Sequence, residues 1–137
     1  QAHHGRVYSL AYHPDGRQVL MTSGERDRMI KLWELETCAS PERPTTAAAL
    51  AGAGISPTPP SSPFAIVQMI APVAHVRWRP PASDGSGRWH LACCAGTHDH
   101  KVHIWDALRP TTPLYSLGGH TDACAGFAFL PPSADTP

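Results

Sequence analysis

Residue types that together perform acyl transfer occur close to the start of the 137-residue chain. They are a histidine, a serine and an aspartate, at His3, Ser23 and Asp27. A hydrolase would need the serine on a sharp nucleophile turn, beside hydrogen-bond donors for an oxyanion. Ser23 is instead followed by a tight-turn glycine, no oxyanion donors are apparent, and burial between strands is expected. The sequence therefore predicts no catalytic residues and no enzyme.

Side-chain types that bind zinc gather in the second half of the chain. They are His90, His98, His100 and His103, with Cys93 and Cys94 nearby. Zinc sites use paired spacings such as CxxC or HxxxH, whereas His98 and His100 flank a turn and His100 and His103 fall on opposite strand faces. We expect surface and turn histidines here, with no metal and no cofactor. A histidine-rich metal-binding module is the less favoured alternative.

Charge and hydropathy exclude two classes of partner. Lys+Arg 11 balance Asp+Glu 11, so the basic footprint of a nucleic-acid-binding protein is missing. No run of eighteen apolar residues occurs, so membrane insertion is not expected. The four cysteines include the adjacent pair Cys93 and Cys94, which suits reduced cytosolic thiols better than a disulfide framework. The chain starts at Gln1, and we expect it to be a piece of a longer protein.

Short strands must position these groups, because apolar residues alternate and no segment shows a sustained helical period. A stretch between residues 37 and 63 is different: six of the fifteen prolines lie there, among small side chains. We expect it to be a disordered Pro/Ala-rich insertion. The predicted strands are residues 6–12, 18–23, 29–35, 64–70, 73–79, 89–95, 101–106, 113–117 and 124–130.

An internal repeat organises these strands. Aligning Trp33 with Trp105 without gaps places Gly24 on Gly96 and Asp27 on Asp99. Without the insertion, the two tryptophans are separated by roughly one propeller blade of four strands. In a second register, His3, Val7, Leu10, Tyr12 and Pro14 share their spacing with His120, Cys124, Phe127, Phe129 and Pro131.

The predicted fold is all-β, a partial β-propeller with two four-stranded antiparallel blades and the first strand of a third. Residues 1–36 would form strands a to c of the first blade, and residues 64–72 its outer strand after the 37–63 insertion. Residues 73–118 would form the second blade, and residues 119–137 the start of the third blade and a tail.

These motifs resemble the WD-repeat family. Gly119-His120 precedes a strand, Pro14-Asp15-Gly16 follows one, Asp27 and Asp99 lie in turns, and Trp105-Asp106 closes a third strand. A closer similarity is to the family of WD repeat-containing protein twenty-four. It is carried by the segments RVYSLAYHPDG, SGERDRMIKLWEL, VQMIAPVAHVRWRP, HLACCAGTHDHKVHIWDALRP and GGHTDACAGFAF.

That family is a subunit of the SEA complex, called GATOR in animals, which regulates the target-of-rapamycin kinase in response to amino acids. The resemblance implies a noncatalytic protein–protein interaction scaffold whose partners are other subunits of that complex. It also implies a cytoplasmic location, including the cytosolic face of the vacuole or lysosome, with no nucleic acid and no direct membrane insertion. Another WD-repeat scaffold, in trafficking or ribonucleoprotein assembly, is the alternative.

The resemblance also assigns roles to residues. A buried relay of hydrogen bonds would include His3, Ser23, Asp27 and Trp33 in the first blade, Asp99 and Trp105 in the second, and His120 in the third. In the second blade Met69 stands at the histidine position and Ala95 at the serine position, so packing should dominate there. Partner contacts at one end of the propeller map to His4, Arg6, Arg26, His98 and Thr121.

Overall fold

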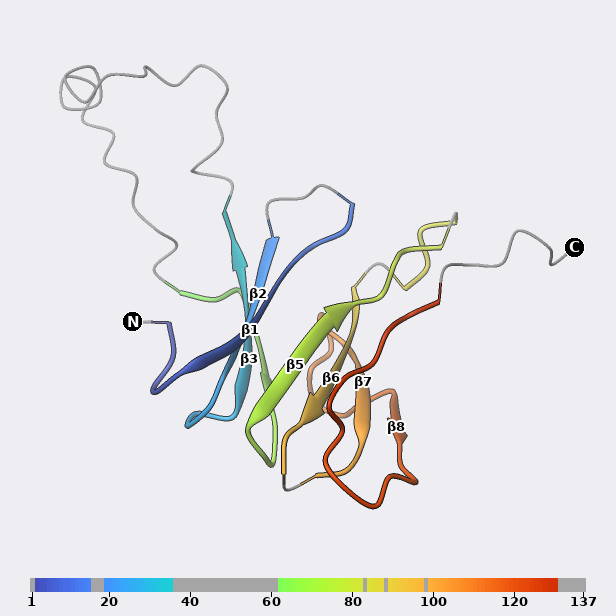
Figure 1. Cartoon of the computed structure of the whole chain (residues 1–137). Helices are drawn as coiled ribbons and strands as arrows, with labels where there is room; N and C mark the ends of the chain where they lie inside the picture. Colours follow the sequence, from blue (N-terminus) through green and yellow to red (C-terminus); the bar gives the residue numbers. More distant parts are fainter. Residues whose placement is uncertain are drawn as a thin grey trace, which may run out of the picture.

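The computed structural model describes residues 2–15, 19–35, 62–82, 84–87, 89–97 and 99–130. The predicted insertion, apart from residues 62 and 63, lies outside these residues. The described part contains eight strands (Figure 1): β1 Val7–Tyr12, β2 Val19–Gly24, β3 Met29–Glu34, β4 Ala65–Gln68, β5 Val73–Trp78, β6 His90–Ala95, β7 Val102–Asp106 and β8 Tyr115–Leu117.

The strands form two four-stranded sheets in chain order, β1-β2-β3-β4 and β5-β6-β7-β8. All six strand pairs are antiparallel, including β3 and β4, which are separated in the sequence by residues 35–64. The predicted fold class, two four-stranded antiparallel blades of a partial propeller, is confirmed. The two sheets lie side by side, with β5 next to the first sheet (Figure 1).

The main core lies between the two sheets. One face of the first sheet contributes Met21, Ile30 and Leu32, which are fully buried. The facing side of the second sheet contributes residues such as Leu91 and Trp105. Because side chains alternate along a strand, each sheet also has a second face that points away from this shared core.

The far face of the second sheet is covered by the C-terminal part of the described chain. Cys124 is buried against Cys94 and Val102, and Phe127 and Phe129 pack on the same cluster. Residues 123–130 nevertheless form no strand, so the prediction of a ninth strand at 124–130 is wrong for this structure. A strand needs a hydrogen-bonded neighbour, and no described segment pairs with this one.

The strand registers correct the gap-free alignment of the repeat. Trp33 is paired with Leu20, and Trp105 is paired with Leu91, so Leu20 and Leu91 are counterparts. Likewise Gly24 pairs with Val7 whereas Ala95 pairs with Val73. The counterpart of Gly24 is therefore Ala95, not Gly96, because the turn between β6 and β7 holds one more residue than the turn between β2 and β3.

Candidate functional site

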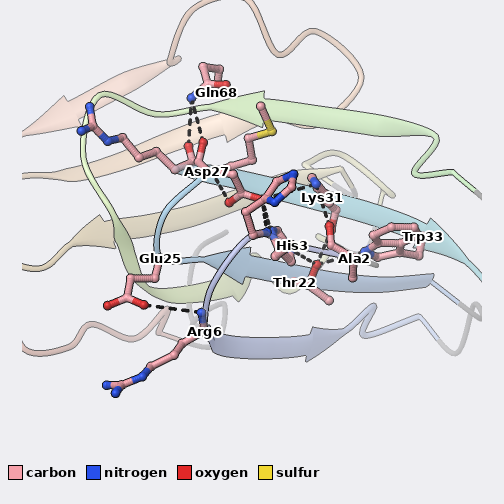
Figure 2. A network of polar contacts seen from close by, with 12 residues as sticks. Ala2, His3, Arg6, Thr22, Glu25, Asp27, Lys31, Trp33 and Gln68 are labelled. Atoms are coloured by element: carbon pink, nitrogen blue, oxygen red, sulfur yellow. Dashed lines mark hydrogen bonds and ion pairs between the residues drawn. The ribbon is translucent and has the colours of Figure 1, made fainter.

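A buried polar network lies on the far face of the first sheet, with His3 at its centre (Figure 2). His3 Nδ1 is 2.8 Å from Asp27 Oδ2, and His3 Nε2 is 2.7 Å from Thr22 Oγ1. The indole Nε1 of Trp33 donates to the same Thr22 hydroxyl at 2.9 Å. His3 donates from Nδ1 to Asp27, and the Thr22 hydroxyl accepts from Trp33. The Thr22 oxygen also lies 3.5 Å from the carbonyl oxygen of Lys31, to which it donates.

Asp27 connects this network to the neighbouring loops. Lys31 Nζ lies 3.3 Å from Asp27 Oδ2, and the backbone amides of His4 and Met29 lie 3.4 Å from the two carboxylate oxygens. Burial alone would raise the pKa of Asp27, but the His3 hydrogen bond and charge, the Met29 amide and Lys31 hold that pKa below its usual value. The ionised form of Asp27 is thus the one that this site stabilises.

Gly24 provides the space that the network occupies. A Cβ at this position would collide with the Asp27 carboxylate and the His3 ring. The absence of a side chain at the end of β2 is therefore required for His3 and Asp27 to meet.

The prediction that Ser23 joins this network is wrong. Ser23 Oγ is buried and has no hydrogen-bond partner among the described residues, whereas Thr22 supplies the hydroxyl. The reason is the two-residue period of a strand: Leu20 pairs with Trp33, so Thr22 shares the tryptophan's face and Ser23 points to the other face. Strand parity in the sequence could have identified Thr22.

The second sheet has sulfur at the equivalent positions. Met69 precedes Val73 by the same spacing as His3 precedes Val7, and Cys93 is the counterpart of Thr22. Cys93 Sγ lies 3.9 Å from Met69 Sδ, and the Trp105 indole lies beside this thiol. Trp105 Nε1 has no hydrogen-bond partner among the described residues. The serine position expected at Ala95 is occupied by Cys94, because Ala95 is the counterpart of Gly24. A sulfur contact between Cys93 and Met69 replaces the polar network.

Burial controls the chemistry of the cysteines in this sheet. Burial raises the pKa of Cys93 to about 12, and burial with the neighbouring Cys124 raises the pKa of Cys94 to about 11. Thiols with such pKa values are protonated at neutral pH and poorly nucleophilic. These cysteines therefore act as packing groups.

Asp99 forms a separate polar group at the outer edge of the second sheet. Asp99 Oδ2 is 2.6 Å from His103 Nε2, and His103 Nδ1 is 2.8 Å from Ser116 Oγ. The prediction that His103 is a surface histidine is wrong, because its exposed fraction is 9 % and both ring nitrogens are bonded. The four-residue spacing from Asp99 to His103, which matches that from Asp27 to Lys31, was the available sequence signal.

Asp99, His103 and Ser116 are hydrogen-bonded in the same order as the members of a catalytic triad. Ser116 lies in β8, an edge strand of three exposed residues. Neither of the two described pockets includes Ser116. The group is therefore suited to joining β7 to β8.

The predicted partner-contact residues divide between several places. His4, Arg6, Arg26 and Thr121 are exposed, and His98 lies outside the described residues. Arg6 and Arg26 line one pocket of about 570 Å³, which we call the arginine pocket. Its complete lining is Gly5, Arg6, Glu25, Arg26, Arg28 and Pro72.

Two further predicted positions lie apart from this pocket. Thr121 is not among its lining residues. His120, predicted to join a relay, is exposed and has no hydrogen bond within the described part of the chain. The sequence interpretation missed Arg28, although it directly follows the turn aspartate Asp27.

Two observations limit other kinds of site. Across the described ranges, no three His, Cys, Asp or Glu side chains lie close enough together to hold a metal ion. The described residues also include no helix long and apolar enough to cross a bilayer.

Two antiparallel four-stranded sheets, each with a tryptophan in its third strand and an aspartate in the preceding turn, define consecutive blades of a WD-repeat propeller. In these features the chain resembles the WD-repeat family. The family model described as "WD domain, G-beta repeat" matches residues 1–34.

Similarity to known proteins extends beyond one repeat. The chain is 34% identical over 131 residues to the GATOR2 complex protein WDR24 of Homo sapiens, covering 96% of the chain and 13% of that relative. The Wdr24 protein of Drosophila melanogaster is 34% identical over 128 residues, with coverages of 93% and 13%. WDR24 of Dictyostelium discoideum is 28% identical over 133 residues, with coverages of 97% and 10%. The chain thus spans 10% to 13% of the length of these relatives.

Proposed function

We propose that the chain is part of a noncatalytic scaffold subunit of a GATOR2-type complex, and that this subunit acts on target-of-rapamycin signalling. The similarity to human WDR24 over 96% of the chain carries this proposal. Its site of action would be the cytoplasm and the cytosolic face of the vacuole or lysosome. Its partners would be the other subunits of the complex.

The geometry of the polar groups supports a scaffold over an enzyme. His3, Asp27 and Thr22 are bonded to one another and to Trp33 beneath the surface. Such a closed network leaves no reactive group facing a ligand and fixes the strands against one another. Rigid blades with exposed loops suit partner binding, because loops on a sheet scaffold hold the contact residues.

The end of the first sheet where β1 begins and β2 turns into β3 is the proposed contact surface. Arg6 and Arg26 meet there, and His4 is exposed next to them. His98 and Thr121, from the second and third repeats, are proposed to continue this surface. Arginine suits such a role because it is enriched among residues that dominate interface energies.

Affinity purification tests the assignment. The full-length protein, tagged and expressed from its own locus, should recover the other subunits of a GATOR2-type complex in stoichiometric amounts. Its deletion should blunt the change in target-of-rapamycin kinase activity when amino acids are withdrawn and restored. Recovery of coat, trafficking or ribonucleoprotein subunits instead would favour the alternative scaffold.

A further inference from the structure

The arginine pocket concentrates positive charge on a chain whose net charge is zero. Arg6, Arg26 and Arg28 line it against one acidic residue, Glu25. None of the three guanidinium groups forms an ion pair with a carboxylate of the described residues. The pocket therefore carries an unneutralised charge of about two, which attracts an anion.

The backbone around the pocket holds the arginines in place. Gly5 has a φ of 90°, and a Cβ there would lie 2.9 Å from Arg26 Cγ, so this glycine makes room for the Arg26 stem. Arg28 adopts a φ of 55°, a left-handed conformation that is costly for a residue with a side chain. Its Nη1 donates to the carbonyl oxygen of Ile70 at 3.2 Å. The loop conformation is thus fixed by the chain itself.

Glu25 is engaged from within the chain and does not fill the pocket. Tyr8 Oη donates to Glu25 Oε1 at 2.8 Å, and the Arg6 amide donates to Oε2 at 3.4 Å. The Tyr8 hydrogen bond, the Arg6 amide and the charges of Arg6 and Arg26 lower the pKa of Glu25. The carboxylate stays ionised and bound to the first strand, leaving the guanidinium groups for another anion.

A second pocket of different chemistry adjoins the first. It has a volume of about 530 Å³, is mostly apolar, and lies between β1 and β5. It shares Glu25 and Pro72 with the arginine pocket, so the two form one continuous surface. Its other lining residues include Tyr8, Ala74, His75 and Gly96.

We propose that these two pockets together bind an extended segment of a partner protein in which an Asp or Glu side chain is next to an apolar one. The acidic side chain would lie between Arg6 and Arg26, where the planar guanidinium groups can each bond a carboxylate. The neighbouring apolar side chain would enter the pocket between β1 and β5. This inference rests on the proposed scaffold function and names the chemistry of its partner.

The alternatives fit the surface less well. Nucleic acid requires a basic surface that follows many phosphates, whereas this positive charge is confined to one pocket beside apolar walls. A phosphorylated side chain would also be attracted by the arginines. The limited charge of the pocket, already offset by Glu25, matches one carboxylate better than a dianion.

A synthetic peptide array tests the proposal with the purified full-length protein. The probes are nonapeptides whose central residue is Asp, Glu, Gln, Lys or phosphoserine, followed by Leu or Ser. We expect Asp-Leu and Glu-Leu peptides to bind about tenfold more tightly than the Gln-Leu peptide, with binding weakened by salt. The double variant Arg6→Gln, Arg26→Gln should reduce their binding to the Gln-Leu level.

A matched variant controls for a general change in charge. Arg77→Gln, Arg109→Gln removes the same charge from exposed positions outside both pockets and should leave peptide binding unchanged. Thermal unfolding of both variants should match the unmodified protein. Equal loss in the control, equal binding of Gln-Leu peptides, or binding of phosphoserine peptides alone would overturn the proposal. Because the probes are synthetic, failure to recover complex subunits would overturn the proposed function without changing this result.

Discussion

The two blades place a tryptophan in the same position and surround it with different chemistry. In the first blade, Trp33 donates to Thr22, which is bonded to His3 and through it to Asp27. In the second blade, the indole of Trp105 lies beside the Cys93 thiol, with Met69 beyond it.

The contacts in the two blades differ in how strictly they fix the geometry of the strands as well as in polarity. Hydrogen bonds fix angles and distances, so the first blade holds one arrangement of its strands and loses much when a partner is removed. Sulfur contacts are soft and adapt to small displacements. The second blade also has the longer turn and keeps its aspartate for His103 at the outer edge. The repeat therefore conserves shape while the stabilising interactions change.

Removing the turn aspartates should give the largest difference in stability between the two blades. Asp27→Ala leaves a buried His3 and Lys31 without their carboxylate, which we expect to cost about 3 kcal/mol. Asp99→Ala leaves His103 with Ser116 and should cost about 1 kcal/mol. Hydrogen exchange of strand amides in the full-length protein measures each blade separately: the loss of protection in β2 and β3 should be roughly a hundredfold for Asp27→Ala. Equal losses would contradict the comparison.

Alanine substitutions of Gly24, at the end of β2, and of Gly96, which follows β6, should give the next largest difference in stability. Gly24→Ala places a methyl group against Asp27 and His3 and should cost about 2.5 kcal/mol through overpacking and loss of the network. At Gly96 a Cβ meets nothing within 4 Å, so Gly96→Ala should change stability by less than about 0.5 kcal/mol. Thermal unfolding of the two variants provides the measurement. Similar melting temperatures would show that Gly24 is not needed to accommodate the network.

Adjacent hydroxyls in β2 test which side chain belongs to the network. Thr22→Val keeps the shape but leaves Trp33 Nε1 and His3 Nε2 without their partner, at an expected cost of about 2 kcal/mol. Ser23→Ala removes a hydroxyl that already has no partner and should be neutral or slightly stabilising. Exchange protection of β2 and β3 amides distinguishes the two. A larger effect at Ser23 would restore the interpretation made from the sequence.

Introducing a hydroxyl into the second blade tests the comparison in reverse. Cys93→Thr places an acceptor beside Trp105 Nε1, as Thr22 does for Trp33, and should gain about 1 kcal/mol. The added protection should appear in β6 and β7, with β2 and β3 unchanged. Cys93→Ala, which adds no acceptor, should instead lose stability. If both variants are equally destabilised, the indole does not need a hydrogen-bond partner.

The smallest expected difference between the two blades is in how their stability depends on pH. The pKa of Asp27 is lowered on folding, so its contribution is present above the ordinary value of 3.8 and is lost as pH falls through the folded pKa. The pKa of Cys93 is raised from 9.0 to about 12, so its contribution is present below 9.0 and is lost as pH rises toward 12. Melting temperatures across pH should show an acid loss that Asp27→Asn reduces and an alkaline loss that Cys93→Ala reduces. The shifted pKa values of Glu25 and Cys94 account for part of what remains.

Strand order and the repeat could be predicted from the sequence because apolar alternation reports directly on strands. Two details of the site could not be predicted from the sequence. A gap-free alignment matched Gly24 to Gly96, since nothing in the letters shows that the second turn holds an extra residue. The bond from His103 to Ser116 joins β7 to β8, and only the strand register brings these residues together. Long-range pairing, rather than local propensity, determined both.

The covering of the second sheet by residues 124–130 has a consequence for how stability is distributed along the chain. Cys124, Phe127 and Phe129 pack on the face of this sheet that points away from the first sheet. The second sheet is therefore packed on both faces by neighbouring parts of the chain. Its stability depends on the residues that follow it as well as on the first sheet, as in repeat proteins whose units are stabilised by their nearest neighbours.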